Sequence, residues 1–225
     1  KGSKEQKIAD FYKNILDAER RNEIGTAPIK PYLADINSAK NIKELADVQT
    51  KLIRDLHMAP FTAFSVTVDF KDSTKYIMHF GTMEPYLTKD FYQNGSEAQK
   101  ASYLKYLKSV SEIAGENMTD KQVEDIYNFE KMLANKKLNP EDGNNVDKAY
   151  NIYTFDEIQS LFPSIDMNDV FESLGLKKED KILVIDKGLT EEFACLFTEE
   201  NLEILKNSAK LSIILNYGGA LNTEF

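Results

Sequence analysis

Three segments of the chain begin with a capping box, in which serine or threonine is followed three residues later by glutamine or glutamate. Ser96 pairs with Gln99, Thr119 with Gln122 and Thr154 with Glu157. In this motif the two side chains satisfy free backbone N–H groups at a helix start. Apolar residues then recur at helical spacing. Behind the first two boxes they are Tyr103, Leu107, Val110 and Ala114, and Val123, Ile126, Tyr127 and Leu133. The short loop at Gly115 predicts that these two helices lie antiparallel.

Five further helices are predicted from similar patterns. An amphipathic stripe begins at Ile8 and stops near Gly25, and Pro28 suits the first turn of a short helix. Asn41 with Glu44 forms a capping pair, and Asp166 caps a helix that ends at Gly175. The last helix begins after Thr198. Three of these helices have a clear apolar face. In the first helix it contains Ile8, Phe11, Tyr12, Ile15 and Leu16; in the helix capped by Asn41 it contains Ile42, Leu45, Leu52, Ile53 and Leu56; and in the last helix it contains Leu202, Leu205, Ala209 and Ile213.

One segment, at about residues 62–80, has the alternation of a β-hairpin. Apolar and polar residues alternate with a period of two, which is typical of half-buried strands. The predicted buried face contains Phe64, Val66, Val68 and Phe70, and the returning strand contains Tyr76, Met78 and Phe80. Residues 182–185 suit either a strand or an extended connector, and residues 139–145 suit a loop. The predicted fold class is mainly α, with one small β-hairpin.

Composition narrows the class of protein. The 225 residues are 42% hydrophobic, enough for one domain or at most two, and carry a net charge of −9. This acidic balance argues against nucleic acid or an anionic membrane surface as a partner. No apolar run reaches about 18 residues, so no membrane contact is expected from this segment. The single Cys195 excludes an internal disulfide, and its apolar surroundings predict a small core residue. The pattern is that of a fragment of a longer protein.

The chain offers few groups for catalysis. A zinc peptidase helix needs His-Glu-x-x-His, whereas His57 precedes Met58 and His79 precedes Phe80. There is no Gly-x-Ser-x-Gly elbow and no glycine-rich phosphate loop. We therefore expect no catalytic, cofactor-binding or metal-binding residue within these 225 residues.

Glu130 falls among Tyr127, Leu133 and Ala134, on or near the buried helix face. A buried carboxylate needs a partner, because leaving one unpaired is costly. We hypothesise that an arginine supplies it, with Arg21 as the first choice. The alternative is that Glu130 lies at the edge of the stripe and reaches water.

The sequence motifs of the hairpin resemble those of the neprilysin family of zinc metallopeptidases. Residues 60–69 match P-F-x-x-F-x-V-x-x-D, and residues 71–76 match K-D-S-x-x-Y. Further motifs similar to those of the family occur in the same order along the chain. They are Arg21-Asn22 with Gly25 and Pro28; Lys89-Asp90-Phe91-Tyr92; Phe129-Glu130 with Leu133-Ala134; and Pro140-Glu141-Asp142. Residues 115–120 resemble the family's zinc-ligand element G-E-N-x-x-D, but no His-Glu-x-x-His precedes them, and we interpret them as a turn between helices.

The sequence also departs from the family. The family's G-L-x-L-P is replaced at residues 81–87, and its upstream segment and both downstream zinc motifs are missing from this sequence. Paired cysteines are missing too, which favours a bacterial member.

The resemblance implies that residues 1–225 form the N-terminal, non-catalytic lid domain of a zinc metalloendopeptidase. Zinc belongs to the parent protein, and the expected partners are its C-terminal catalytic domain and peptide substrates, whose size the closed chamber limits. The candidate chamber-facing parts are the solvent side of the hairpin and residues 81–89 and 139–145. The alternative is a stand-alone helical module that binds a peptide or protein, and a hydrolase using these residues alone ranks third. An extracytoplasmic parent, secreted or lipid-anchored, is favoured over a cytoplasmic one.

Overall fold

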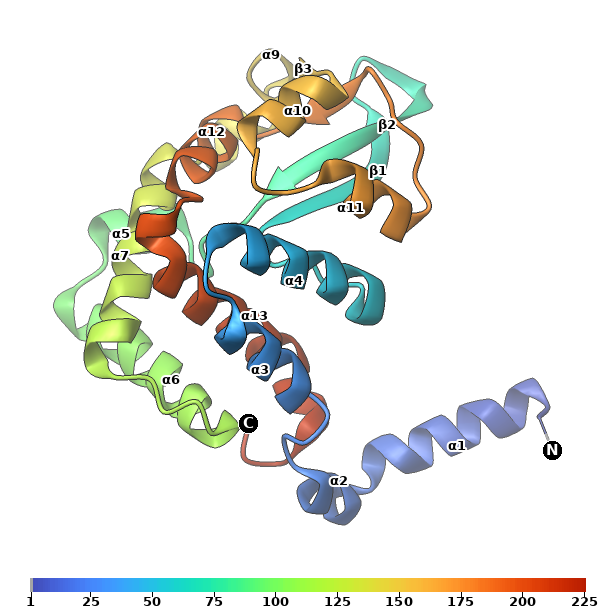
Figure 1. Cartoon of the computed structure of the whole chain (residues 1–225), viewed down its shortest axis with the longest axis vertical. Coiled ribbons are helices and arrows are strands. Elements are labelled where there is room, and N and C mark those ends of the chain that lie inside the picture. The colour runs from blue at the N-terminus through green and yellow to red at the C-terminus, as the bar shows by residue number, and fades with distance from the viewer. Residues whose placement is uncertain (1) are drawn as a thin grey trace.

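A computed structural model describes residues 2–225, and its elements follow the order shown in Figure 1. The α-helices are α1 (Lys4–Leu16), α2 (Ala18–Ile24), α3 (Lys30–Ser38), α4 (Ile42–Leu56), α5 (Lys89–Asn94), α6 (Glu97–Ala114), α7 (Asp120–Lys136), α8 (Pro140–Gly143), α9 (Val146–Ala149), α10 (Phe155–Leu161), α11 (Met167–Leu174), α12 (Lys187–Leu196) and α13 (Leu202–Leu221). The strands are β1 (Thr62–Asp69), β2 (Asp72–Thr82), β3 (Asn151–Tyr153) and β4 (Ile182–Val184), and a 3-10 turn covers Glu199–Asn201.

The predicted helices are confirmed, except that the segment predicted as one helix up to Gly25 is two: α1 ends at Leu16, and the Asp17 side chain caps α2. All three capping boxes form, at the starts of α6, α7 and α10. The predicted faces of α6 and α7 are buried, and both helices pack against the long helix α13 (Figure 1). The short helix after Gly25 begins at Lys30 rather than Pro28, and the predicted loop at 139–145 contains the short helix α8.

The hairpin is part of a larger sheet. β1 and β2 pair antiparallel as predicted, but two more strands extend the sheet in the order β1-β2-β4-β3. β4 pairs parallel to β2 and antiparallel to β3. Residues 182–185 are therefore a strand for most of their length, whereas β3 was not predicted. Each short strand has only three residues, too few for a clear periodic pattern.

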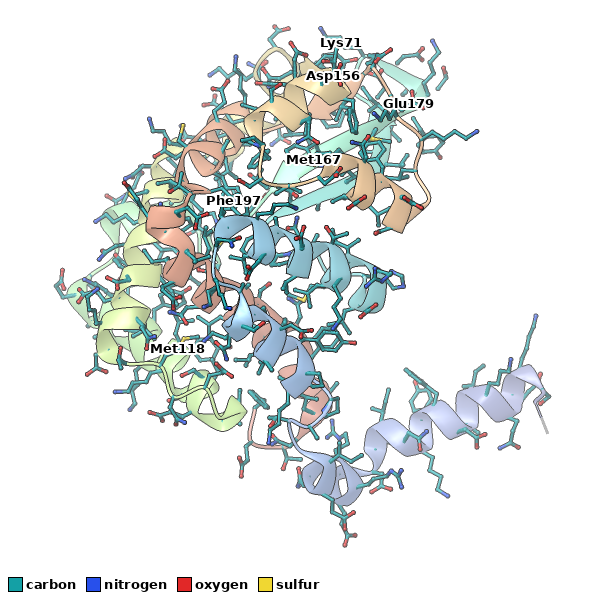
Figure 2. All side chains as sticks on the ribbon, in the orientation of Figure 1. Lys71, Met118, Asp156, Met167, Glu179 and Phe197 are labelled. Carbon is teal, nitrogen blue, oxygen red and sulfur yellow. The ribbon has the colours of Figure 1, made fainter. Side chains whose placement is uncertain are left out.

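The buried face of the hairpin is shorter than its alternation predicted. Phe64 packs on Phe80 and Phe171, with ring centroids 4.9 and 4.7 Å away. Val66 on the same face is 62% exposed, and Val68 and Phe70 are also exposed. The outer end of the hairpin, near Lys71, projects past the covering helices α10 and α11 (Figures 1 and 2). The predicted alternation was correct, but only the half of the hairpin that contains Phe64 and Phe80 is covered by other elements.

An aromatic cluster joins the sheet to the helices. Phe197, labelled in Figure 2, lies within 6.3 Å of the ring centroids of Phe61, Phe162 and Phe193. Gln49 of α4 adds a buried polar link, because its Oε1 accepts from the backbone N–H groups of Phe61 and Thr62, each at 2.9 Å.

Cys195 is exposed on α12, so its predicted core position was wrong; its helix buries Leu189, Thr190 and Phe193 instead. Within residues 2–225, no helix combines the length and the apolar character that a membrane crossing requires.

Helix α12 approaches the end of α7 so closely that only glycine fits at position 188. A Cβ atom there would lie 2.8 Å from the backbone oxygen of Lys136. We expect Gly188→Ala to lower the free energy of unfolding by about 1 to 2 kcal/mol, because backbone must move to admit the methyl group. Urea titration measures this change. Gly143→Ala is the control, since its Cβ would meet nothing within 4 Å; equal stability of the two variants would contradict the prediction.

Candidate functional site at the end of the sheet

The cavity of interest lies where the parallel strands β2 and β4 end. It has a volume of about 260 Å³. Ligands of open α/β sheets commonly bind beyond the carboxyl ends of parallel strands. Two of the three candidate chamber-facing parts, residues 81–89 and 139–145, contribute residues to this cavity. His79 of the hairpin lines it as well. The lining residues are His79, Phe80, Gly81, Thr82, Glu84, Lys137, Leu138, Asn139, Pro140, Gly143, Ile185, Asp186, Leu189 and Thr190.

The Asp186 carboxylate connects two segments of the cavity wall through hydrogen bonds. Its Oδ1 accepts from the backbone N–H of Leu189 at 3.0 Å and so caps α12. Its Oδ2 accepts from the backbone N–H of Leu138 at 2.7 Å, which ties the segment after α7 to the start of α12. Among the lining residues, Lys137 forms an ion pair with Glu84, and Lys89 Nζ donates to the Lys137 carbonyl at 2.6 Å. These charges are thus engaged within the protein.

His79 contributes a neutral ring to this site. Burial lowers the pKa of His79 below its usual 6.5, and the nearby Glu84 charge opposes this effect only in part. Its Nδ1 lies 3.2 Å from the Ser65 hydroxyl. The other histidine, His57, is exposed and ends α4 in a left-handed conformation. Within residues 2–225, no three histidine, cysteine, aspartate or glutamate side chains are grouped as metal ligands would be.

The segment that resembles a zinc-ligand element is a turn between α6 and α7, as predicted. Gly115 ends α6 in a left-handed conformation, and Thr119 caps α7. Glu116 forms a mostly buried ion pair with Lys210 of α13 at 2.9 Å, and Asn37 of α3 donates to Glu116 at 3.3 Å. Glu116 therefore links the turn to two other helices.

Glu130 is completely buried, but its partner is not Arg21. The hydroxyl groups of Tyr92 and Tyr103 each donate to its Oε2 at 2.8 Å, and the backbone N–H of Tyr86 lies 3.5 Å from Oε1. Arg21 instead donates to the Gly219 carbonyl at 3.0 Å. Both the arginine hypothesis and the water-exposed alternative were wrong, although the argument that a buried carboxylate needs donors was correct. Burial raises the pKa of Glu130 to about 7, against the lowering effect of its hydrogen bonds.

A sequence signal for the true partners existed. Tyr92 lies in the Lys89-Asp90-Phe91-Tyr92 word, and Tyr103 lies in the predicted buried stripe of α6. A buried tyrosine usually directs its hydroxyl to an acceptor. The sequence could not show that both tyrosines bind the carboxylate of Glu130, which follows them in the chain by 38 and 27 residues.

Comparison with known proteins gives a consistent result. The model of the N-terminal part of peptidase family M13 matches residues 1–225. The chain is 23% identical to endothelin-converting enzyme 1 of Cavia porcellus, over 98% of this chain and 31% of that protein. It is 22% identical to a putative zinc metalloproteinase of Streptococcus gordonii, over 94% of this chain and 38% of that protein.

A solved structure shares the fold. The zinc metalloprotease Zmp1 of Mycobacterium tuberculosis, in complex with an inhibitor, matches with a TM-score of 0.82 and 25% identity, over 98% of this chain and 35% of that chain. The open state of the same enzyme also matches with a TM-score of 0.82. The chain spans about a third of the length of these relatives.

Proposed function

This chain belongs to peptidase family M13 and matches the N-terminal domain of that family. On that premise we propose that it is the non-catalytic lid of a zinc metalloendopeptidase. The parent would hold zinc in a C-terminal catalytic domain and cleave peptides with metal-activated water. The lid would close over that centre, exclude bulk water and admit only substrates small enough to enter.

The exposed stripe of α1 carries this proposal. Helix α1 extends away from the rest of the molecule (Figure 1) and buries none of its residues. Its five stripe residues, Ile8, Phe11, Tyr12, Ile15 and Leu16, are between 46% and 74% exposed. A 13-residue helix is only marginally stable in water unless its apolar face is covered. A large exposed apolar face is typical of a surface that another unit covers.

The relatives support a lid that moves. Zmp1 has been solved both in an open state and with an inhibitor. This chain matches these two forms with the same TM-score of 0.82 and a partial open state with a TM-score of 0.71. The existence of several states supports a domain that moves in the whole enzyme. Residues 81–89 and 139–145, which meet at the cavity, are the parts that we propose face the enclosed chamber.

The second candidate function is a stand-alone module that binds a peptide or protein. The two functions differ in what the reading frame encodes after Phe225. The lid function predicts His-Glu-x-x-His followed by Glu-x-x-x-Asp, whereas a stop codon directly after Phe225 would favour the binding module.

An activity assay tests the proposal directly. Incubated with Zn²⁺ and an internally quenched peptide, this chain alone is expected to produce no hydrolysis above a zinc-only control. The full-length parent is expected to cleave the same peptide and to spare large folded proteins. Zinc-dependent hydrolysis by the isolated chain would contradict a non-catalytic role.

A further inference from the structure

A second cavity adjoins the one at the end of the sheet. It has a volume of about 410 Å³ and lies between residues 82–86 and helix α13. Thr82 and Glu84 line both cavities, so the two spaces meet across this short segment. The remaining lining residues are Ala59, Pro60, Met83, Pro85, Tyr86, Ser208, Ser212 and Asn216. We refer to this second cavity as the hydroxyl groove.

Two residues that line this groove carry hydroxyl groups with unused hydrogen-bonding capacity. Three buried side-chain polar atoms lack a hydrogen-bond partner among residues 2–225, and two of them, Thr82 Oγ1 and Ser208 Oγ, belong to lining residues. Ser208 is only 2% exposed. Native structures rarely leave such atoms unsatisfied without a reason, because each has given up hydrogen bonds to water. These two hydroxyls therefore point to a ligand with hydrogen-bonding groups.

The character of the groove indicates which kind of ligand. Ser208, Ser212 and Asn216 are spaced four residues apart on α13, and so follow one face of that helix. Lys206 and Lys210 of the same helix are engaged elsewhere, with Glu203 and Glu116. Glu84, the only charged residue among those of residues 2–225 that line the groove, is paired with Lys137. A neutral ligand with alternating donors and acceptors, such as a peptide main chain, fits this lining.

The adjoining cavity supplies a complementary feature. Phe80, Leu138 and Leu189 give it an apolar wall, and its volume suits a single large side chain. We propose that the two cavities form one peptide-binding site, in which the hydroxyl groove holds main-chain amides and the apolar cavity holds an aliphatic or aromatic side chain. This proposal rests on the lid function, because it takes the ligand to be a peptide within the chamber.

Blocked peptides test this site on the chain as it stands, without zinc or a catalytic domain. The probe is N-acetyl-Gly-Leu-Ala-amide, and binding is followed by NMR through the methyl signals of Thr82 and Leu189. Replacing the probe's leucine with serine is expected to weaken binding at least tenfold, because serine buries much less apolar surface than leucine. Replacing one amide of the probe with an ester is expected to weaken it about fivefold.

Variants locate the binding. Ser208→Ala is expected to leave the chain folded and at least as stable, because it removes a buried hydroxyl without a partner. It should nevertheless weaken probe binding about three- to tenfold. Gly143→Leu, which would add a side chain at the apolar cavity, should weaken it at least tenfold. Ser173→Ala, a serine beside a different cavity, is the matched control and should change nothing.

Several results would overturn the proposal. They are no saturable binding, equal binding of the leucine and serine probes, no effect of Ser208→Ala, and binding that requires a free carboxylate on the probe. None of them bears on whether the full-length parent cleaves peptides, so failure of this site can be distinguished from failure of the lid function.

Discussion

Replacing Glu130 with glutamine is expected to remove a pH dependence from the stability of this domain. The carboxyl group has a pKa of about 7 in the folded chain, compared with 4.5 for the free side chain, because it is buried. Below pH 4.5 it is protonated in both states. Between pH 4.5 and about 7 the unfolded chain releases the proton while the folded chain retains it, so unfolding becomes more favourable as pH rises. At 1.36 kcal/mol per pKa unit, the loss is about 3 kcal/mol.

Glutamine cannot titrate, yet its amide can still accept from one tyrosine hydroxyl and donate to the other. Urea titrations of wild type and Glu130→Gln at pH 4.5 and pH 8 measure the effect. The stability difference between them should change by about 3 kcal/mol in favour of the variant at the higher pH. Taking the difference removes the contribution of His79, whose lowered pKa acts in the opposite direction below pH 6.5.

Glu124→Gln is the matched control, because Glu124 is an exposed carboxylate on the same helix, paired with Lys100. Its stability should follow the wild-type pH profile within about 0.5 kcal/mol. If Glu130→Gln also runs parallel to wild type from pH 4.5 to pH 8, the carboxyl does not hold a raised pKa in the folded protein.

Charges placed on the stripe of α1 are expected to detach this helix from the rest of the parent and leave the isolated domain unaffected. Burying two large apolar side chains contributes about 3 to 5 kcal/mol, so Phe11→Asp with Ile15→Asp should weaken docking more than 100-fold. In the isolated chain these side chains are already exposed, so stability should change by less than about 0.5 kcal/mol.

Hydrogen exchange of the α1 amides provides the measurement, since it reports local opening. In the full-length parent the wild-type amides should exchange at least 100-fold more slowly than in the isolated chain, and the double variant should abolish that protection. Gln6→Asp with Asn14→Asp alters α1 outside the stripe and should retain it. Equal exchange of α1 in the parent and in the isolated chain would show that nothing covers the stripe.

The errors of the sequence predictions have a common origin. Alternation predicts Val66 and Val68 on a buried face, but that face ends at Phe64. The apolar surroundings of Cys195 predict a core position, but Cys195 lies on the exposed side of a helix that buries Phe193. Periodicity identifies which residues share a face, but the neighbouring elements decide how much of that face is covered. For the same reason, Glu130 was correctly expected to need donors and was given the wrong one.

Local patterns in the sequence determined the helices, their caps, the hairpin and the family resemblance, because each depends on residues a few positions apart. Only the tertiary structure decided which distant segments meet. It joined β4 to β2, enclosed Glu130 between Tyr92 and Tyr103, and brought residues 81–89 and 139–145 to one cavity beside Ser208. These arrangements arise from packing between elements far apart in the chain, and no short-range pattern records them.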